Sequence, residues 1–120
     1  MCIRDSVGST HAMTTRDATL DHELIREIAA NVTIPLVLHG SSGVADDQLR
    51  SAVQAGIRKV NVGTALNLAY SRAIRVAMDD ATVSDPRKYL SAARSAVADT
   101  VAQLCAVVAA PMSAGEGQQR

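Results

Sequence analysis

The sequence predicts an α/β fold in which short parallel strands alternate with amphipathic helices, and two observations support this prediction. Residues 34–56 and 58–81 each read as a strand followed by a helix, and the two units are similar in length. Alternation at this spacing implies parallel strands joined by right-handed crossovers. The apolar residues are almost all Ala, Val, Leu and Ile, with no Phe or Trp and two Tyr, and such aliphatic filling suits the interior of a parallel barrel.

The overall composition indicates the size of the domain and which classes of binding partner are not expected. The 120 residues suffice for one small domain with a hydrophobic core. Because 12 basic and 12 acidic residues cancel, we expect neither nucleic acid nor an anionic membrane surface as a partner. No apolar run approaches the ~20 residues of a membrane-spanning helix, and the first ten residues lack the apolar core of a secretory signal. Cys2 and Cys105 lie far apart in the sequence, and two free thiols in the reducing cytoplasm is the simplest interpretation.

The N-terminal residues do not fit the rest of the pattern. Met1–Ser6 (MCIRDS) resembles a translated sequencing scar, so we expect residues 1–6 to be non-native and the native sequence to begin at Val7, in a truncated gene. Val7–Met13 (VGSTHAM) predicts the end of a strand and its loop, and Thr14–Thr19 predicts a polar connection.

A helix and a buried strand follow. A helix is predicted from Asp21, a suitable N-cap, to about Asn31, because Leu24, Ile25 and Ile28 recur at helical spacing. Ile34–Leu38 (IPLVL) is a short continuous apolar run, typical of a parallel strand that is covered on both faces. Pro35 belongs at the start of such a strand, where a missing N–H does least harm.

The next unit repeats this order. After a Gly/Ser loop, a helix is predicted over Asp46–Ala55, with Gly56 as the residue that ends it. Arg58–Val62 (RKVNV) is the next predicted strand, and Gly63 breaks it.

Two further helices complete the chain. The third is predicted over Ala65–Ala81, where six apolar residues alternate at spacings of three and four: Leu66, Ala69, Tyr70, Ala73, Ile74 and Ala77. Asp85 as N-cap and Pro86 as first residue open a fourth helix, which we expect to reach Val108. We therefore place one domain at residues 7–109 and expect residues 110–120, which are small and polar, to form a disordered tail.

Two histidines each follow a strand-like segment. Because the carboxyl ends of parallel strands lie at one edge, about 4.8 Å apart, the side chains of His11 and His39 would come within reach of one ion. The alternative for each is a hydrogen bond to its own loop. Zinc at a catalytic site usually has three protein ligands, and His22, expected to face solvent near a helix start, does not supply the third.

Two loops of small residues have the composition of an anion site. Gly40-Ser41-Ser42-Gly43 follows one strand, and Asn61-Val62-Gly63-Thr64 ends the next and leads into a helix. Small residues let backbone N–H groups converge on an anion, and hydroxyl groups add donors. The alternative is that the glycines serve only tight turns from strand to helix.

Four segments carry a resemblance to a known family. In the order VGSTHAM, LVLHGSSG, KVNVGTALN and DPRKYL, they resemble the C-terminal third of class II fructose-bisphosphate and tagatose-bisphosphate aldolases. The resemblance covers Val7 to about Val108. It implies the C-terminal part of an eight-stranded (β/α)8 TIM barrel, incomplete in this chain, and an enzyme of carbohydrate metabolism and glycolysis that cleaves a ketose bisphosphate to dihydroxyacetone phosphate and an aldehyde phosphate.

The resemblance also implies the site. His11 and His39 would be two of three histidines that bind zinc, and a monovalent cation would lie near the loops. The groups that bind the substrate phosphate would fall on Gly40, Ser41, Ser42, Asn61, Val62, Gly63 and Thr64. The catalytic aspartate and the remaining histidine would lie upstream of Val7, so no catalytic residue is expected in this chain. The full-length protein would be a dimer or tetramer.

Three positions depart from the family pattern, and two other functions remain open. Ala12 and Ser41 stand where glycines are common, and Ala65 where an acidic residue is frequent. The alternatives are a metal-independent phosphate-binding barrel enzyme, in which His39 acts as an acid or base, and a non-catalytic sugar-phosphate-binding protein. Whatever the function, we expect the chain alone to be inactive and poorly folded, because its strands lack neighbours and its metal site lacks a ligand.

Overall fold

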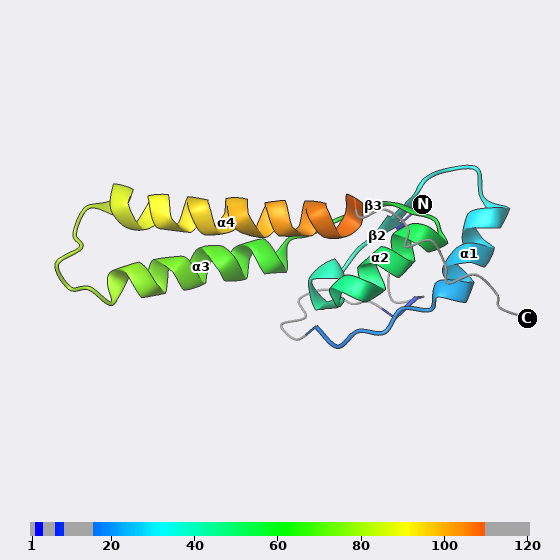
Figure 1. Cartoon of the computed structure of the whole chain (residues 1–120), viewed down its shortest axis with the longest axis horizontal. Coiled ribbons are helices and arrows are strands. Elements are labelled where there is room, and N and C mark those ends of the chain that lie inside the picture. The colour runs from blue at the N-terminus through cyan, green and yellow to red at the C-terminus, as the bar shows by residue number, and fades with distance from the viewer. Residues whose placement is uncertain (1, 4–6, 9–15, 110–120) are drawn as a thin grey trace, which may run out of the picture.

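The computed structural model, which describes residues 2–3, 7–8 and 16–109, has an α/β body and a long helical hairpin that extends away from it (Figure 1). The strands are β1 (Cys2–Ile3), β2 (Leu36–Leu38) and β3 (Ile57–Val60). The helices of the body are α1 (His22–Asn31) and α2 (Asp46–Ala55), and those of the hairpin are α3 (Thr64–Met78) and α4 (Pro86–Ala109). The hairpin makes the molecule elongated, with extents of 64 × 32 × 24 Å.

The strands form one parallel sheet in the order β1-β2-β3, as the alternation of strands and helices predicts. Cys2 lies opposite Val37, and Leu38 lies opposite Val60. The first strand lies before the expected strand end at Val7, since β1 covers residues 2–3. Val7 and Gly8 themselves form a turn. Strand β1 falls within residues 1–6, whose non-native origin stays a prediction because strand pairing does not test it.

Helices α1 and α2 have the predicted bounds because strong local signals fix their ends. The Asp21 carboxylate accepts a hydrogen bond from the Leu24 N–H at 2.9 Å, so it caps α1 as expected. Helix α2 ends at Gly56, whose φ of 130° favours glycine.

Strands β2 and β3 are both shorter than predicted. Strand β2 begins at Leu36 because Pro35 has no N–H for the ladder, and Ile34 before it is exposed. Strand β3 begins one residue early, at Ile57, and ends at Val60, although the Asn61 N–H still donates to the Leu38 carbonyl at 3.0 Å.

The hydrophobic core lies between the sheet, α1 and α2. Helix α2 contacts α1, β3 and α4, so it joins the body to the hairpin. The buried residues of the core are Val7, Ala18, Leu20, Ile25, Leu36, Leu38, Val44, Leu49, Ala52, Ala55, Ile57 and Val107.

The hairpin is held mainly by contact between α3 and α4. None of the residues of α3 is buried, and α3 ends at Met78 and not at the predicted Ala81. In α4 only Ala93 and Val107 are buried. Several large apolar side chains on the hairpin are exposed: Leu68, Tyr70, Val76, Met78, Leu90 and Val101.

Helix α4 is long and apolar enough to cross a membrane by length and composition alone. This corrects the expectation that the sequence contains no apolar run of that length. A single helix of this kind is weak evidence for a membrane protein, and one side of α4 packs along α3.

Candidate functional site

The carboxyl ends of β2 and β3 lead into two loops that lie side by side. After β2, Gly40 adopts a left-handed conformation with φ of 68°, which starts a single 3-10 turn over Ser41–Gly43. After β3, residues 61–63 lead directly into α3, which begins at Thr64. The loops meet because parallel strands end at the same edge of a sheet.

A cavity of about 220 Å³ lies between the two loops. It is lined by Gly40, Ser41, Ser42, Asn61, Val62, Gly63 and Thr64. These are the seven residues that the sequence analysis assigned to phosphate binding, so the structure brings the predicted set together. Their role as phosphate ligands stays a prediction, because nothing here tests binding.

Two hydrogen bonds join the first loop to the second loop and to the start of α3. The Ser41 hydroxyl donates to the Asn61 carbonyl at 2.6 Å. The Ser42 hydroxyl accepts from the Ala65 N–H at 3.0 Å. Ser42 therefore caps the start of α3 from the other loop, while Gly63, at the N-cap position itself, has no side chain to do so.

The chemistry of this cavity suits an oxyanion. None of its seven lining residues carries a charge, so attraction would come from N–H groups, hydroxyl groups and the N-terminal end of α3. The first N–H groups of a helix lack the acceptor four residues earlier that later ones have. In α3 the Ala65 N–H donates to Ser42 and the Leu66 N–H to the Gly63 carbonyl, which leaves the Thr64 N–H for a ligand. A phosphate group offers several acceptor oxygens and matches such a set of donors.

The candidate metal ligands are only partly described. His39 follows β2 directly and is half-buried, whereas His11 lies outside the described residues. Within residues 2–3, 7–8 and 16–109, no three His, Cys, Asp or Glu side chains come together as a metal site would require. The described residues therefore include one of the candidate metal ligands, His39, and do not form a complete metal site.

His22 differs from its expected position. It was expected to face solvent, but its ring is half-buried and its Nε2 atom lies 3.0 Å from Gln48 Oε1. Its Nδ1 atom is buried and has no hydrogen-bond partner in the structure. His22 thus links α1 to α2, which explains why it takes no part in the cavity.

Behind the Ser41–Gly43 turn lies a second, smaller cavity of about 110 Å³. Arg16 borders it, donates to the Val44 carbonyl at 2.9 and 2.6 Å, and forms an ion pair with Asp46 at 2.5 Å. On the far side are residues of α4, including Thr100 and Gln103. Sequence reasoning missed these supports because an arginine in a polar connection has no local pattern that sets it apart from a solvated one.

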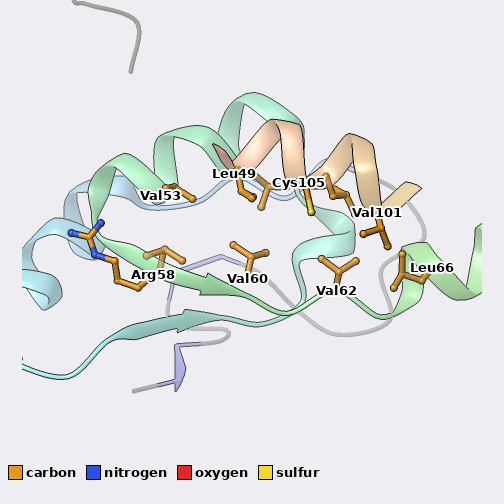
Figure 2. A pocket seen from close by; sticks show the side chains of 11 residues that line it. Leu49, Val53, Arg58, Val60, Val62, Leu66, Val101 and Cys105 are labelled. Atoms are coloured by element: carbon orange, nitrogen blue, oxygen red, sulfur yellow. The ribbon is translucent and has the colours of Figure 1, made fainter. Parts of the chain in front are cut away.

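An apolar cavity of about 400 Å³ lies beside β3, under α2 and α4 (Figure 2). Figure 2 shows the side chain of Val62 on this side, near Leu66 and Val101. Only the backbone of Val62 is therefore suited to face the smaller anion cavity. Cys105 also borders the apolar cavity and is a free, exposed thiol, as expected; the side chain of Cys2 lies outside the described part of the chain.

Comparison with known proteins decides the family. The sequence model of class II fructose-bisphosphate aldolases matches residues 3–112. The chain belongs to the class II fructose-bisphosphate aldolase family. The match includes both cavity loops and both candidate histidines, so the candidate site lies within the part of the chain that matches the aldolase family.

Solved aldolases share the fold of this aldolase chain. The YdjI aldolase from Escherichia coli K12 is 26% identical, with a TM-score of 0.70, over 82% of this chain and 37% of that one. The fructose-bisphosphate aldolase from Campylobacter jejuni is 17% identical, with a TM-score of 0.69, over 86% of this chain and 38% of its own. The chain thus spans less than two-fifths of the length of either solved aldolase.

Proposed function

We propose that the chain is part of a metal-dependent ketose-bisphosphate aldolase and that its two loops bind the phosphate group of the dihydroxyacetone phosphate half of the substrate. The observation that supports this most is the single cavity lined by seven residues from two successive strand ends, in a member of the aldolase family. The reaction proposed is reversible aldol cleavage of a ketose bisphosphate to dihydroxyacetone phosphate and an aldehyde phosphate.

In this proposal the loops hold the ketose half of the substrate in register. The N–H groups of Ser41, Ser42 and Thr64 donate to the phosphate oxygens. Those of Gly43, Ala65 and Leu66 already have acceptors within the chain. The Ser42 hydroxyl accepts from the Ala65 N–H, and this polarises its own O–H for donation to the anion. Fixed donors of this kind orient the reacting carbon without ordering the loops during the reaction.

We further propose that His39 and His11 are two ligands of a divalent ion, which is zinc in the simplest case. Imidazole nitrogen is a preferred zinc ligand, and His39 immediately precedes the phosphate loop. When bound, the ion would polarise the ketone oxygen and stabilise the negative charge that develops as the carbon–carbon bond breaks. The ligands that complete the site remain outside the described residues.

We propose, too, that the parallel sheet belongs to an eight-stranded barrel in the full-length enzyme. All three strands are parallel, and β3 is an edge strand of the described sheet. An edge strand has unpaired N–H and C=O groups that a further parallel strand would satisfy. A barrel is also consistent with the chain matching less than two-fifths of each solved aldolase.

The direct test is a titration of the chain with dihydroxyacetone phosphate, in which binding is monitored through the amide NMR signals. The amide signals of residues 40–43 and 61–65 are expected to shift and to saturate, whereas dihydroxyacetone without phosphate should leave them in place. Ser42→Ala should weaken binding at least roughly tenfold, because a hydrogen bond to a charged group contributes about 1.5–3 kcal/mol.

A matched control is Ser51→Ala, which removes a half-buried serine of α2 that lines none of the cavities described here. It should bind dihydroxyacetone phosphate as the unmodified chain does. Shifts confined to other parts of the chain, or equal binding of the two dihydroxyacetone compounds, would contradict a phosphate site between the loops. If the full-length protein still turns over substrate after exhaustive chelation of metal ions, that result would favour the metal-independent enzyme.

A further inference from the structure

Ser41 is the one polar residue among the buried side chains of the described chain, with 3% of its surface exposed. Its hydroxyl donates to the Asn61 carbonyl at 2.6 Å, from one cavity loop to the other. It borders both the anion cavity and the smaller cavity behind the turn, so it lies in the wall between them.

The backbone N–H and carbonyl of Asn61 both form hydrogen bonds to the segment that contains Ser41. Its N–H donates to the Leu38 carbonyl at 3.0 Å, at the end of β2, and its carbonyl accepts from Ser41. Since both bonds come from the same stretch of chain, they fix the position of the second loop relative to the first.

The two serines of the turn use their hydroxyl groups in opposite senses. A hydroxyl has one proton to donate and two lone pairs to accept. Ser41 gives its only proton to Asn61, so only lone pairs remain, and lone pairs repel an oxyanion. Ser42 accepts from the Ala65 N–H and keeps its proton for a ligand.

We propose that Ser41 is a positioning residue, which sets the separation of the two loops by binding the Asn61 carbonyl and whose hydroxyl does not contact the bound anion. This inference rests on the proposed phosphate site. It separates Ser41 from Ser42, which a sequence pattern treats as equivalent. It also gives a physical role to a serine at a position where the family pattern has glycine.

Such a bond favours binding by preorganisation. Loops that are already ordered in the absence of ligand lose less conformational entropy when the anion binds. Without the Ser41 hydroxyl, the Asn61 carbonyl lacks a donor in a buried place, and the second loop gains freedom. The expected effect is a weaker affinity for phosphate, with no loss of a direct ligand.

The decisive measurement is the ¹³C signal of the Asn61 carbonyl in the unmodified chain, because a carbonyl shift reports the hydrogen bond that it accepts. On saturation with inorganic phosphate, this signal should not move in the direction that Ser41→Ala causes, because Ser41 stays bound to the carbonyl. A move in the direction that Ser41→Ala causes would show that the anion takes the proton, and would overturn the proposal.

Variants give an independent test. Ser41→Ala should move the Asn61 carbonyl signal in the phosphate-free protein and weaken phosphate binding by roughly threefold to tenfold. Ser42→Ala should weaken binding but leave that carbonyl signal in place, and Ser51→Ala should change neither. If Ser41→Ala fails to fold, Ser41→Cys, which keeps a weak donor, should show the same changes at reduced size.

Failure of the proposal differs from failure of the proposed function. If the unmodified chain binds no phosphate, the phosphate site is wrong, and the carbonyl signal of phosphate-free Ser41→Ala still decides whether Ser41 positions the loop. If the chain binds phosphate and Ser41→Ala changes neither the affinity nor the carbonyl signal, the site stands and the positioning role is wrong.

Discussion

Gly56 lies at the C-terminal end of α2 with a φ of 130°, and a Cβ atom there would lie 2.6 Å from the Ala29 Cβ atom of α1. We expect Gly56→Ala to lower the free energy of unfolding by roughly 1–3 kcal/mol, because the substitution adds both backbone strain and this close contact. Denaturant titration with a circular dichroism readout measures the change.

The control for that substitution is Gly63→Ala. A Cβ atom at Gly63 would meet nothing within 4 Å, and its φ of −137° lies outside the positive range that favours glycine. The free energy of unfolding of Gly63→Ala should therefore differ little from that of the unmodified chain. Equal destabilisation by the two substitutions would show that the packing of α2 against α1 is not what Gly56 protects.

The proposed metal site gives a second prediction at the level of single residues. If His39 is a ligand, His39→Ala should weaken zinc binding by the chain at least roughly tenfold, since the ion loses a nitrogen that coordinates it. Competition with a chromogenic zinc chelator measures the affinity. His22→Ala is the matched control, because His22 binds Gln48 and lies on α1, and it should leave zinc affinity unchanged. Equal affinity in the chain and in His39→Ala would exclude His39 as a ligand.

The sequence predicts which residues surround the cavity but not what each hydroxyl does there. The loops after two parallel strands predict the two segments, and the resemblance to the aldolase family assigns the seven residues within them. The opposite roles of Ser41 and Ser42 depend on which neighbour each hydroxyl meets, and that is set by tertiary packing. The same reason hid Arg16, whose partners lie about thirty residues away in the sequence.

The N-terminal end of α4 carries a pH-dependent interaction. The pKa of Asp85 is lowered from its ordinary value of 3.8, first by the Arg87 guanidinium and then by the Arg87 backbone N–H. Because the folded pKa is below the unfolded one, this interaction stabilises the helix start above pH 3.8, and the contribution is lost as the pH falls through the folded pKa.

Arg87→Ala should therefore raise the pKa of Asp85, although not fully, because the backbone hydrogen bond to the carboxylate remains. Carboxyl ¹³C titration by NMR measures it. Asp80 provides an internal control in the same connection, because its pKa is lowered by the hydroxyl and then the backbone N–H of Thr82. An unchanged Asp85 pKa, or an equal rise at Asp80, would contradict the assigned cause.

Among the elements, prediction was accurate where ends are set by local chemistry. The bounds of α1 and α2 follow from an N-cap at Asp21 and a glycine at residue 56. Strand ends depend on pairing with a distant segment, so β2 and β3 differ from prediction by one or two residues. Helix α3 ends at Met78, and the Asp80 carboxylate accepts hydrogen bonds from the N–H and hydroxyl of Thr82 in the connection that follows.

At the scale of the whole molecule, stability should be uneven. The body contains the buried core, whereas α3 has no buried residue and relies on α4 for contact. Amides of residues 70–78 and 87–92 should exchange with solvent at least roughly tenfold faster than those of α2 and β2. Hydrogen exchange read by NMR tests this, and uniform protection across both parts would contradict it.

The shape of the molecule was the part least open to prediction. The apolar stripe of α3 indicated that one side of the helix would be covered, and the Pro86 signal correctly placed the next helix. Neither pattern identifies the surface that covers the stripe. That α3 and α4 cover each other, away from the sheet, follows from tertiary contacts alone (Figure 1).

The two ends of the hairpin meet at the same place. Helix α3 starts at the anion cavity, and the C-terminal half of α4 returns behind the Ser41–Gly43 turn, while the tip extends away from the body. The site therefore constrains where the hairpin is anchored but not how far it reaches. Over generations, matched gains or losses of whole helical turns in both arms would alter the reach of the hairpin and preserve the loops beneath it.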